Sequence, residues 1–183
     1  MDLHYPAAPW SGFLKGISIV VTLLLLGISL LLAFVVPAHA HAPPLLHKVV
    51  FALPWLILLA AVLCVVRGYE LRDNALFVRR LFWTTRVVLG ELREAATDPE
   101  AGAGSIRLFG NGGLFSFSGW FRNAKLGRYR AFVTDWQCAV VLHGSACTVV
   151  LSPADPAGFV RALQTPASLR KQGKPLPRWR QSR

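Results

Sequence analysis

The chain has 183 residues, 54% of them hydrophobic, with 20 Lys and Arg against 9 Asp and Glu and a net charge of +11. A chain this short could not cover two helices that are apolar on every face. The uncharged apolar runs at residues 16–36 and 49–66 therefore exclude an ordinary soluble globular protein. Three cysteines without a CxxC pattern give no disulfide framework.

The N-terminal part is predicted to be a cytoplasmic segment at residues 1–15, followed by a two-helix transmembrane hairpin at residues 16–66. At 1.5 Å per residue, a helix over residues 16–36 spans about 31 Å and one over residues 49–66 spans about 27 Å. Both lengths are close to the thickness of the hydrocarbon core of a bilayer. Both runs therefore predict membrane spans.

The linker between the two runs fixes their arrangement. Pro37, Pro43 and Pro44 prevent one continuous helix, so we expect a hairpin. Cations collect on the cytoplasmic side of membrane spans. The linker carries one lysine, whereas the residues after the second run carry four arginines, namely Arg67, Arg72, Arg79 and Arg80. The protein is therefore expected in the inner (plasma) membrane as a multi-pass protein with both termini in the cytoplasm.

One alternative concerns the first run. Residues 38–40 resemble the small-residue site of a signal peptidase, which would cut after Ala40 or Ala42. The run exceeds the usual limit of about 15 residues for the apolar region of a signal peptide, so we favour an uncleaved anchor. With either outcome the second run returns the chain to the cytoplasm.

Residues 67–164 are predicted to form one small domain built of strands. Alternating side chains place Leu76 and Val78 on one face of a strand, and Tyr129 and Ala131 on the inner face of another. Residues 91–104 are polar and rich in glycine, so we expect a loop there. Seven strands are expected in all, at residues 69–71, 75–80, 83–89, 105–109, 128–134, 138–142 and 147–151.

One helix follows the last strand. Ser152 is predicted as its N-cap, Pro153 as its first residue and Asp155 as an acid near the positive end of the helix dipole. Phe159 and Leu163 lie at helical spacing, so the helix can cover an open end of a sheet. The expected fold class is α+β: a transmembrane hairpin, then a small β-barrel or sandwich of about seven antiparallel strands with one C-terminal helix.

Four segments resemble a known family. They are YELRDNALFVRR (69–80), RLFGNGGLFSFSGWF (107–121), GRYRAFVTD (127–135) and VVLSPADPAGFVRAL (149–163). Together they are similar to bacterial pleckstrin-homology-like (PH-like) domain proteins that carry N-terminal membrane spans. The resemblance implies two perpendicular antiparallel sheets closed by a C-terminal helix. Most such proteins have no assigned activity, so the resemblance implies a fold much more than a function.

Aromatic side chains form the first candidate interaction surface. They surround residues 110–113, which lack the Gly-Lys-Ser/Thr ending of a phosphate-binding loop and predict a turn with positive φ. These rings either pack in the core or form an exposed rim that contacts lipid or a partner protein. The candidate rim consists of Phe115, Phe117, Trp120 and Phe121.

Basic residues form the second candidate surface. Arg79 and Arg80 lie close to the second span, and residues 165–183 form a basic, disordered tail. Each cation near a membrane surface attracts anionic head groups by about 1 kcal/mol. Basic tails also bind nucleic acid, but tethering to the membrane makes that partner the least expected. The tail candidates are Arg170, Lys171, Lys174, Arg178, Trp179 and Arg180.

No catalytic set, metal-ligand cluster or cofactor motif emerges from the sequence. His143, for example, has no nucleophile partner at a recognisable spacing. The sequence therefore predicts a membrane-tethered, non-enzymatic binding or assembly module, whose partner is another protein or a copy of itself. Two alternatives stay open: a sensor of anionic lipid or, less expected, nucleic acid, and an accessory subunit of a membrane enzyme or transporter.

Overall fold

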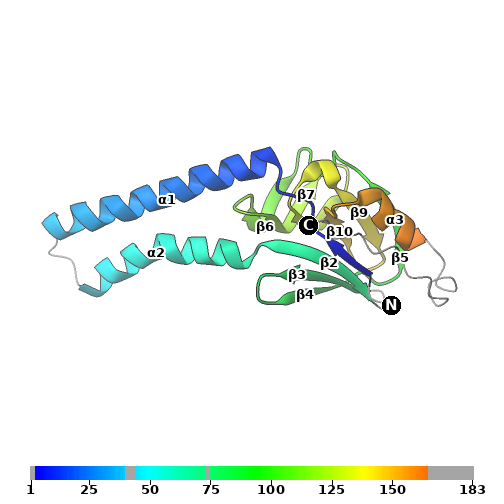
Figure 1. The fold of residues 1–183 in the computed structure, drawn as a ribbon, viewed down its shortest axis with the longest axis horizontal. Coiled ribbons are helices and arrows are strands. Elements are labelled where there is room, and N and C mark those ends of the chain that lie inside the picture. The colour runs from blue at the N-terminus through cyan, green and yellow to red at the C-terminus, as the bar shows by residue number, and fades with distance from the viewer. Residues whose placement is uncertain (1–2, 40–43, 73–74, 165–183) are drawn as a thin grey trace, which may run out of the picture.

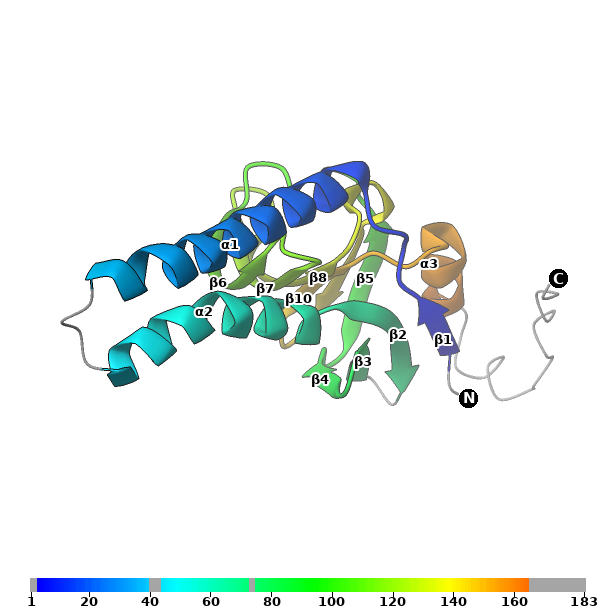
Figure 2. The same ribbon diagram turned by 60° about the vertical axis from the view of Figure 1, so that its left-hand side comes forward.

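The structure is a computed structural model that describes residues 3–39, 44–72 and 75–164. Two helices, α1 (Gly12–His39) and α2 (Pro44–Leu63), project side by side from one end of a β-rich domain; we call this pair the arm (Figure 1). A view turned by 60° shows that the base of the arm lies beside strands β6 (Ile106–Gly112) and β7 (Phe117–Asn123) (Figure 2).

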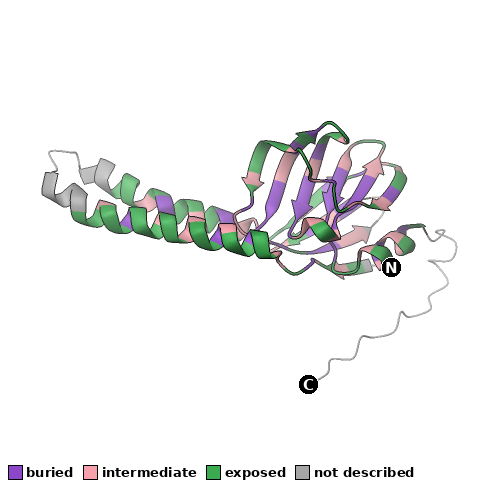
Figure 3. Ribbon diagram, turned by 90° about the horizontal axis from the view of Figure 1, so that it is seen from above, coloured by how far each residue is buried: buried purple, intermediate pink, exposed green. Residues whose placement is uncertain are grey.

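The surface of the arm is largely apolar. Along its described length most side chains are exposed (Figure 3), among them Leu23, Leu30 and Phe34 at 63%, 61% and 72%. The segment Gly12–Phe34 of α1 is long and apolar enough to cross a membrane, whereas α2 has a shorter apolar segment, Lys48–Leu63. By length and composition, the structure supports a membrane crossing for only one of the two predicted spans.

The domain contains two sheets and a C-terminal helix, α3 (Pro156–Gln164), which confirms the α+β class. The strand order is β1-β2-β3-β4 in the four-stranded sheet and β5-β9-β10-β8-β7-β6 in the six-stranded sheet. In the six-stranded sheet β10 runs parallel to β8, so the expectation of purely antiparallel sheets is wrong. The other strands are β1 (Leu3–Pro6), β2 (Val66–Arg72), β3 (Ala75–Arg80), β4 (Thr84–Val88), β5 (Leu92–Thr97), β8 (Gly127–Val133), β9 (Val140–Gly144) and β10 (Thr148–Leu151).

The six-stranded sheet has an apolar cluster on each face. On one face Phe132 packs with Leu76 and Val78 of the four-stranded sheet and with Phe159 of α3. On the other face the second cluster includes Leu14, near the start of α1. Alternation along a strand sends successive side chains to opposite faces, and the alternations predicted for β3 and β8 are confirmed by this burial.

The residues before α1, expected as a separate segment, belong to the domain. β1 pairs antiparallel with β2, with Tyr5 opposite Tyr69. The Tyr5 ring also meets the Phe159 ring edge-on, at 4.9 Å between centroids. The chain therefore leaves the domain into α1 and returns from α2 to the same sheet.

Ten strands are present in the described residues, and β1, β5 and β7 were not among the seven expected ones. The expected loop at residues 91–104 contains β5, an edge strand in which only half of the side chains are polar. The C-terminal helix also begins later than expected. The N–H of Gly158 donates to Oδ1 of Asp155 at 2.9 Å, so Asp155 is the N-cap, and Ser152 is instead fully buried.

Candidate functional site

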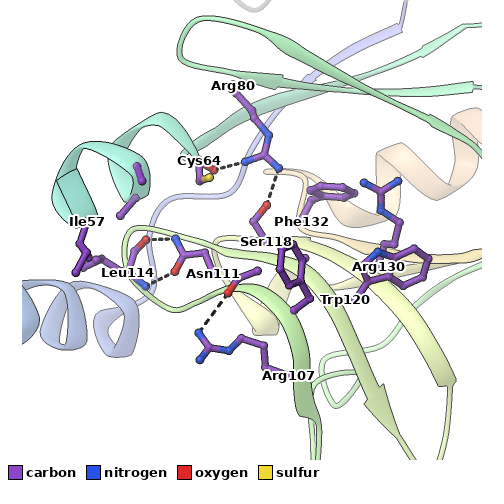
Figure 4. Close-up of a pocket in the computed structure, with 15 residues that line it drawn as sticks. Ile57, Cys64, Arg80, Arg107, Asn111, Leu114, Ser118, Trp120, Arg130 and Phe132 are labelled. Carbon is purple, nitrogen blue, oxygen red and sulfur yellow. Dashed lines mark hydrogen bonds between the residues drawn. The ribbon is translucent and has the colours of Figure 1, made fainter. Parts of the chain in front are cut away.

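A groove of about 630 Å³ lies where the C-terminal end of α2 meets β6, β7 and β8 (Figure 4). The helix supplies an apolar wall, and the strands supply three arginines, aromatic rings and small polar residues. The lining residues are Ile57, Ala60, Ala61, Cys64, Arg80, Arg107, Phe109, Gly110, Asn111, Leu114, Ser118, Gly119, Trp120, Arg130 and Phe132.

Arg80, the last residue of β3, joins the arm to both sheets. Its guanidinium donates to the carbonyl oxygen of Cys64 at 2.7 Å, to Oγ of Ser118 at 2.7 Å and to Oγ1 of Thr85 at 3.0 Å. Burial lowers the pKa of Arg80, and the positive charge of Arg130 lowers it further. An arginine nevertheless keeps its charge in proteins, so this side of the groove is cationic.

Arg130, from β8, lies against two aromatic rings. Its Cζ is 5.4 Å from the centroid of the Trp120 ring and 5.2 Å from that of Phe132. Arg80 lies over the same Phe132 ring, at 5.6 Å. The Nε atom of Arg130 is buried and has no hydrogen-bond partner within the described part of the chain. Two cations therefore share one ring, and one of them has an unsatisfied buried donor.

The β6–β7 hairpin forms the opposite wall. Asn111 holds its tip, because its Oδ1 accepts from the N–H of Leu114 at 3.0 Å and its Nδ2 donates to the carbonyl oxygen of the same residue. The N–H of Phe115 donates to Oγ of Ser18 in α1 at 2.9 Å. The Phe115 ring also lies against Trp10, at 5.7 Å between centroids. This wall is therefore fixed to α1, while Arg80 fixes the other side of the groove to α2.

The groove is electropositive. None of its fifteen lining residues is Asp or Glu, whereas three are Arg. Over the described residues there is also no group of three or more His, Cys, Asp or Glu side chains that could hold a metal ion. The chemistry that this arrangement offers is recognition of an anion beside an apolar wall.

The sequence profile of the family described as Bacterial PH domain matches residues 67–167, more than half of the chain. The chain belongs to the bacterial PH domain family. The resemblance that the sequence suggested is thereby confirmed for the domain. Comparisons with curated proteins and with solved structures give no match.

The two arginines predicted as a lipid site are separated in this bacterial PH domain. Arg79 is half-exposed, and its Nη1 lies 3.3 Å from Oε1 of Glu70. Arg80 points the other way, into the groove, where it holds α2. Only Arg80 therefore contributes to a site that combines several cations.

The predicted aromatic rim is divided between the core and the groove. Phe117 and Phe121 are 9% and 4% exposed, so these two rings belong to the core and a rim that includes them is wrong. Trp120 lines the groove, and Phe115 packs against Trp10. The positive φ expected in residues 110–113 is confirmed at Gly110 and Gly113, at 107° and 124°. In addition Phe115 itself has a positive φ of 65°.

The predicted tail site lies outside the described residues. These positions are Arg170, Lys171, Lys174, Arg178, Trp179 and Arg180, and they stay a prediction. The predicted cleavage sites after Ala40 and Ala42 also lie outside the described residues.

Arg107 and Arg130 line the groove but were not predicted as site residues from the sequence. They come from β6 and β8, which lie on either side of β7 in the sheet. No local motif joins them, because strand pairing alone brings them to one groove. The one signal available was the alternation of β8, which indicated that Arg130 faces away from Tyr129 and Ala131.

Proposed function

We propose that this bacterial PH domain protein is anchored in the inner membrane by two crossings and acts at the cytoplasmic face as a non-enzymatic binding or assembly module. In this proposal the arm positions the domain against the bilayer, and an exposed strand of the domain binds a protein partner or a second copy of the chain. The proposal assigns no catalytic step to the domain.

The observation that carries the proposal is the pairing of β1 with β2. It fixes the residues just before α1 beside those just after α2, on one side of any membrane that the arm enters. If α1 crosses a bilayer, the chain must therefore cross back before Val66. The segment available is α2, whose apolar part, Lys48–Leu63, corresponds to about 24 Å and could cross a thin bilayer if the side chain of Lys48 reaches its surface.

Aromatic residues beside the base of the arm support this arrangement. The turn between β3 and β4 lies next to the end of α2, since Arg80 contacts both Trp83 and Cys64 through hydrogen bonds. Phe82 and Trp83 in this turn are 76% and 45% exposed. Tryptophan and other amphipathic rings favour the head-group region of a bilayer, where this turn would lie.

The outer edge of β6 supports a binding role. β6 is the last strand of its sheet, and among the described residues no strand pairs with its outer side. Its Ile106 and Phe109 are 71% and 77% exposed. An exposed, apolar edge strand favours pairing with a further strand. The opposite edge, β5, is contacted by α3.

The topology is tested in spheroplasts with single cysteines in a variant without native cysteine. We expect a membrane-impermeant maleimide to label Ala42→Cys, between the two helices, and to label Ala157→Cys, exposed on α3, only after lysis. Carbonate washing at alkaline pH should leave the protein in the membrane. Labelling of Ala157→Cys in intact spheroplasts, or release by carbonate, would refute the anchoring.

The binding role is tested by photo-crosslinking in native membranes, with the crosslinker at Ile106 on β6. We expect a product whose mass identifies either a second copy or another protein. The matched control carries the crosslinker at Ala157 on α3, which the proposal leaves unpartnered. If neither position gives a product, or if both give the same one, the β6 edge is not the binding site.

A further inference from the structure

The groove beside α2 has two chemically different halves. Ile57, Ala60 and Leu114 form an apolar half, and Phe109 extends it outward. Arg80 and Arg130 form the other half around the ring of Phe132, and Arg107 lies apart from them at the β6 wall of the groove (Figure 4). A ligand that fits both halves is an amphiphile with an anionic head.

The cationic half has unused hydrogen-bond donors. The bonds of Arg80 to described residues take three of its five N–H groups, which leaves two for a ligand. The buried Nε of Arg130 has no partner in the described residues, and Arg107 is exposed with one bond, to the carbonyl oxygen of Gly110 at 3.3 Å. Because the Nε of Arg130 is buried, a ligand in the groove would meet the terminal nitrogens of this guanidinium, for which no bond to the described residues competes.

The charges lead to the same ligand chemistry. Arg80 and Arg130 share the ring of Phe132, and among the described residues no carboxylate lines the groove to balance them. Repulsion between two like charges is relieved by an anion bound between them. The planar guanidinium matches a phosphate group, with two N–H groups directed at two oxygens.

The position of the groove identifies the source of the phosphate. One wall is the last turns of α2, so the groove lies where the arm leaves the domain. We infer that it binds the phosphate head of an anionic membrane phospholipid, with the acyl chains lying along the apolar wall of α2. This inference rests on the proposed anchoring. A free phosphate ion would use the arginines but would leave the apolar half empty.

The test uses the full-length protein in detergent micelles that contain equal amounts of phosphatidylglycerol and phosphatidylcholine, with retained lipids counted by native mass spectrometry. We expect the wild type to retain phosphatidylglycerol preferentially. Arg107→Gln and Arg130→Gln should each weaken its retention about fivefold, the effect of about one surface cation. The double variant should show the product of the two effects, about 25-fold, if they act independently.

Arg122→Gln is the matched control, because Arg122 is exposed on β7 but does not line the groove. It should retain phosphatidylglycerol like the wild type. Because Arg107 is exposed, Arg107→Gln should not disturb folding, and the melting temperature of this variant should equal that of the wild type. A loss of lipid in this variant therefore cannot be caused by misfolding. Inorganic phosphate and glycerol 1-phosphate, added as soluble competitors, should not displace the lipid at equal concentration.

Three results would overturn the inference. They are wild-type retention of phosphatidylglycerol by both single variants, displacement by inorganic phosphate as effective as by lipid, and a groove variant that changes the oligomeric state instead of lipid retention. The lipid site and the membrane anchoring can be refuted independently of each other. A wild type that resists carbonate but shows no lipid preference refutes only the lipid site, whereas release by carbonate refutes the anchoring.

Discussion

The guanidinium of Arg80 donates to the main-chain oxygen of Cys64 at 2.7 Å and so binds the C-terminal end of the second helix to strand β3. The last carbonyl groups of a helix have no partner within the helix and carry its negative end charge. A half-buried arginine satisfies this position by both charge and hydrogen bonding. The same side chain donates to Ser118 of β7, so one residue connects the arm with both sheets.

Substitution of Arg80 should therefore destabilise the protein. Arg80→Gln removes charge-assisted bonds to Cys64 and Ser118 and leaves their acceptors in a partly buried site. We expect the free energy of unfolding to fall by about 2–4 kcal/mol. The measurement is chemical unfolding of the full-length protein in detergent micelles, followed by circular dichroism of the strands.

Arg79→Gln is the neighbouring control. Arg79 is half-exposed, and its ion pair with Glu70 is of the surface kind, worth less than about 1 kcal/mol. Equal effects of the two substitutions would contradict the role given to Arg80.

The sequence predicted best those elements that have a clear period and one buried face. Alternation identified β3, with Leu76 and Val78 both buried. The apolar runs at residues 138–142 and 147–151 predicted β9 and β10. His143, outside the first run, also belongs to β9, and its Nδ1 lies 3.2 Å from Oγ1 of Thr148 in β10. In each case the local pattern and the tertiary environment require the same side chains.

The elements that the sequence missed depend on partners far along the chain. β1 has four residues, and only pairing with β2, more than 60 residues later, makes them a strand. β5 is an edge strand whose apolar residues, Leu92, Ala95 and Ala96, do not alternate with its polar ones, so it has no apolar alternation to detect. The groove is harder still, because its cations come from β3, β6 and β8 and only the fold brings them together.

Tyr69 gives a prediction about pH. Its hydroxyl donates to the carbonyl oxygen of Phe132 at 2.6 Å, and burial raises the pKa of this phenol from 10.0 to about 12. Between these two values the unfolded chain loses the proton and the folded chain keeps it. The contribution of Tyr69 to the free energy of unfolding is therefore fully present below pH 10. It should fall by about 1.4 kcal/mol per pH unit as the pH rises towards 12.

Tyr69→Phe isolates this contribution. The variant should be less stable by about 1–3 kcal/mol below pH 10, because it loses a buried hydrogen bond, and its stability should fall less steeply above pH 10. The measurement is chemical unfolding from pH 8 to 12. The other tyrosines titrate in both proteins, so the difference between the two curves reports Tyr69 alone. Parallel curves would contradict its raised pKa.

Gly119 should not tolerate a side chain. Its φ is 150°, and a Cβ atom there would meet the carbonyl oxygen of Phe109 and lie 2.9 Å from Cα of Gly110. Both are backbone atoms of β6, so the β6–β7 pair must separate. We expect Gly119→Ala to cost at least about 2 kcal/mol. Gly127→Ala, with a φ of 65° but open space around it, should cost only about 1 kcal/mol. Thermal unfolding distinguishes the two.

Ser152 and Asp155 provide the last prediction, since the sequence assigned the helix cap to Ser152 and the structure assigns it to Asp155. Oγ of Ser152 accepts from the N–H of Thr134 at 2.8 Å in the core. Ser152→Ala therefore leaves a buried N–H unpaired, at a cost of about 1–3 kcal/mol. Asp155→Ala removes the N-cap of α3, at about 1 kcal/mol. Hydrogen exchange separates the two roles. Asp155→Ala should speed exchange only in α3, whereas Ser152→Ala should speed exchange in β8 and β10. If Ser152→Ala speeds exchange in α3 alone, Ser152 is the N-cap of α3 and the assignment to Asp155 is wrong.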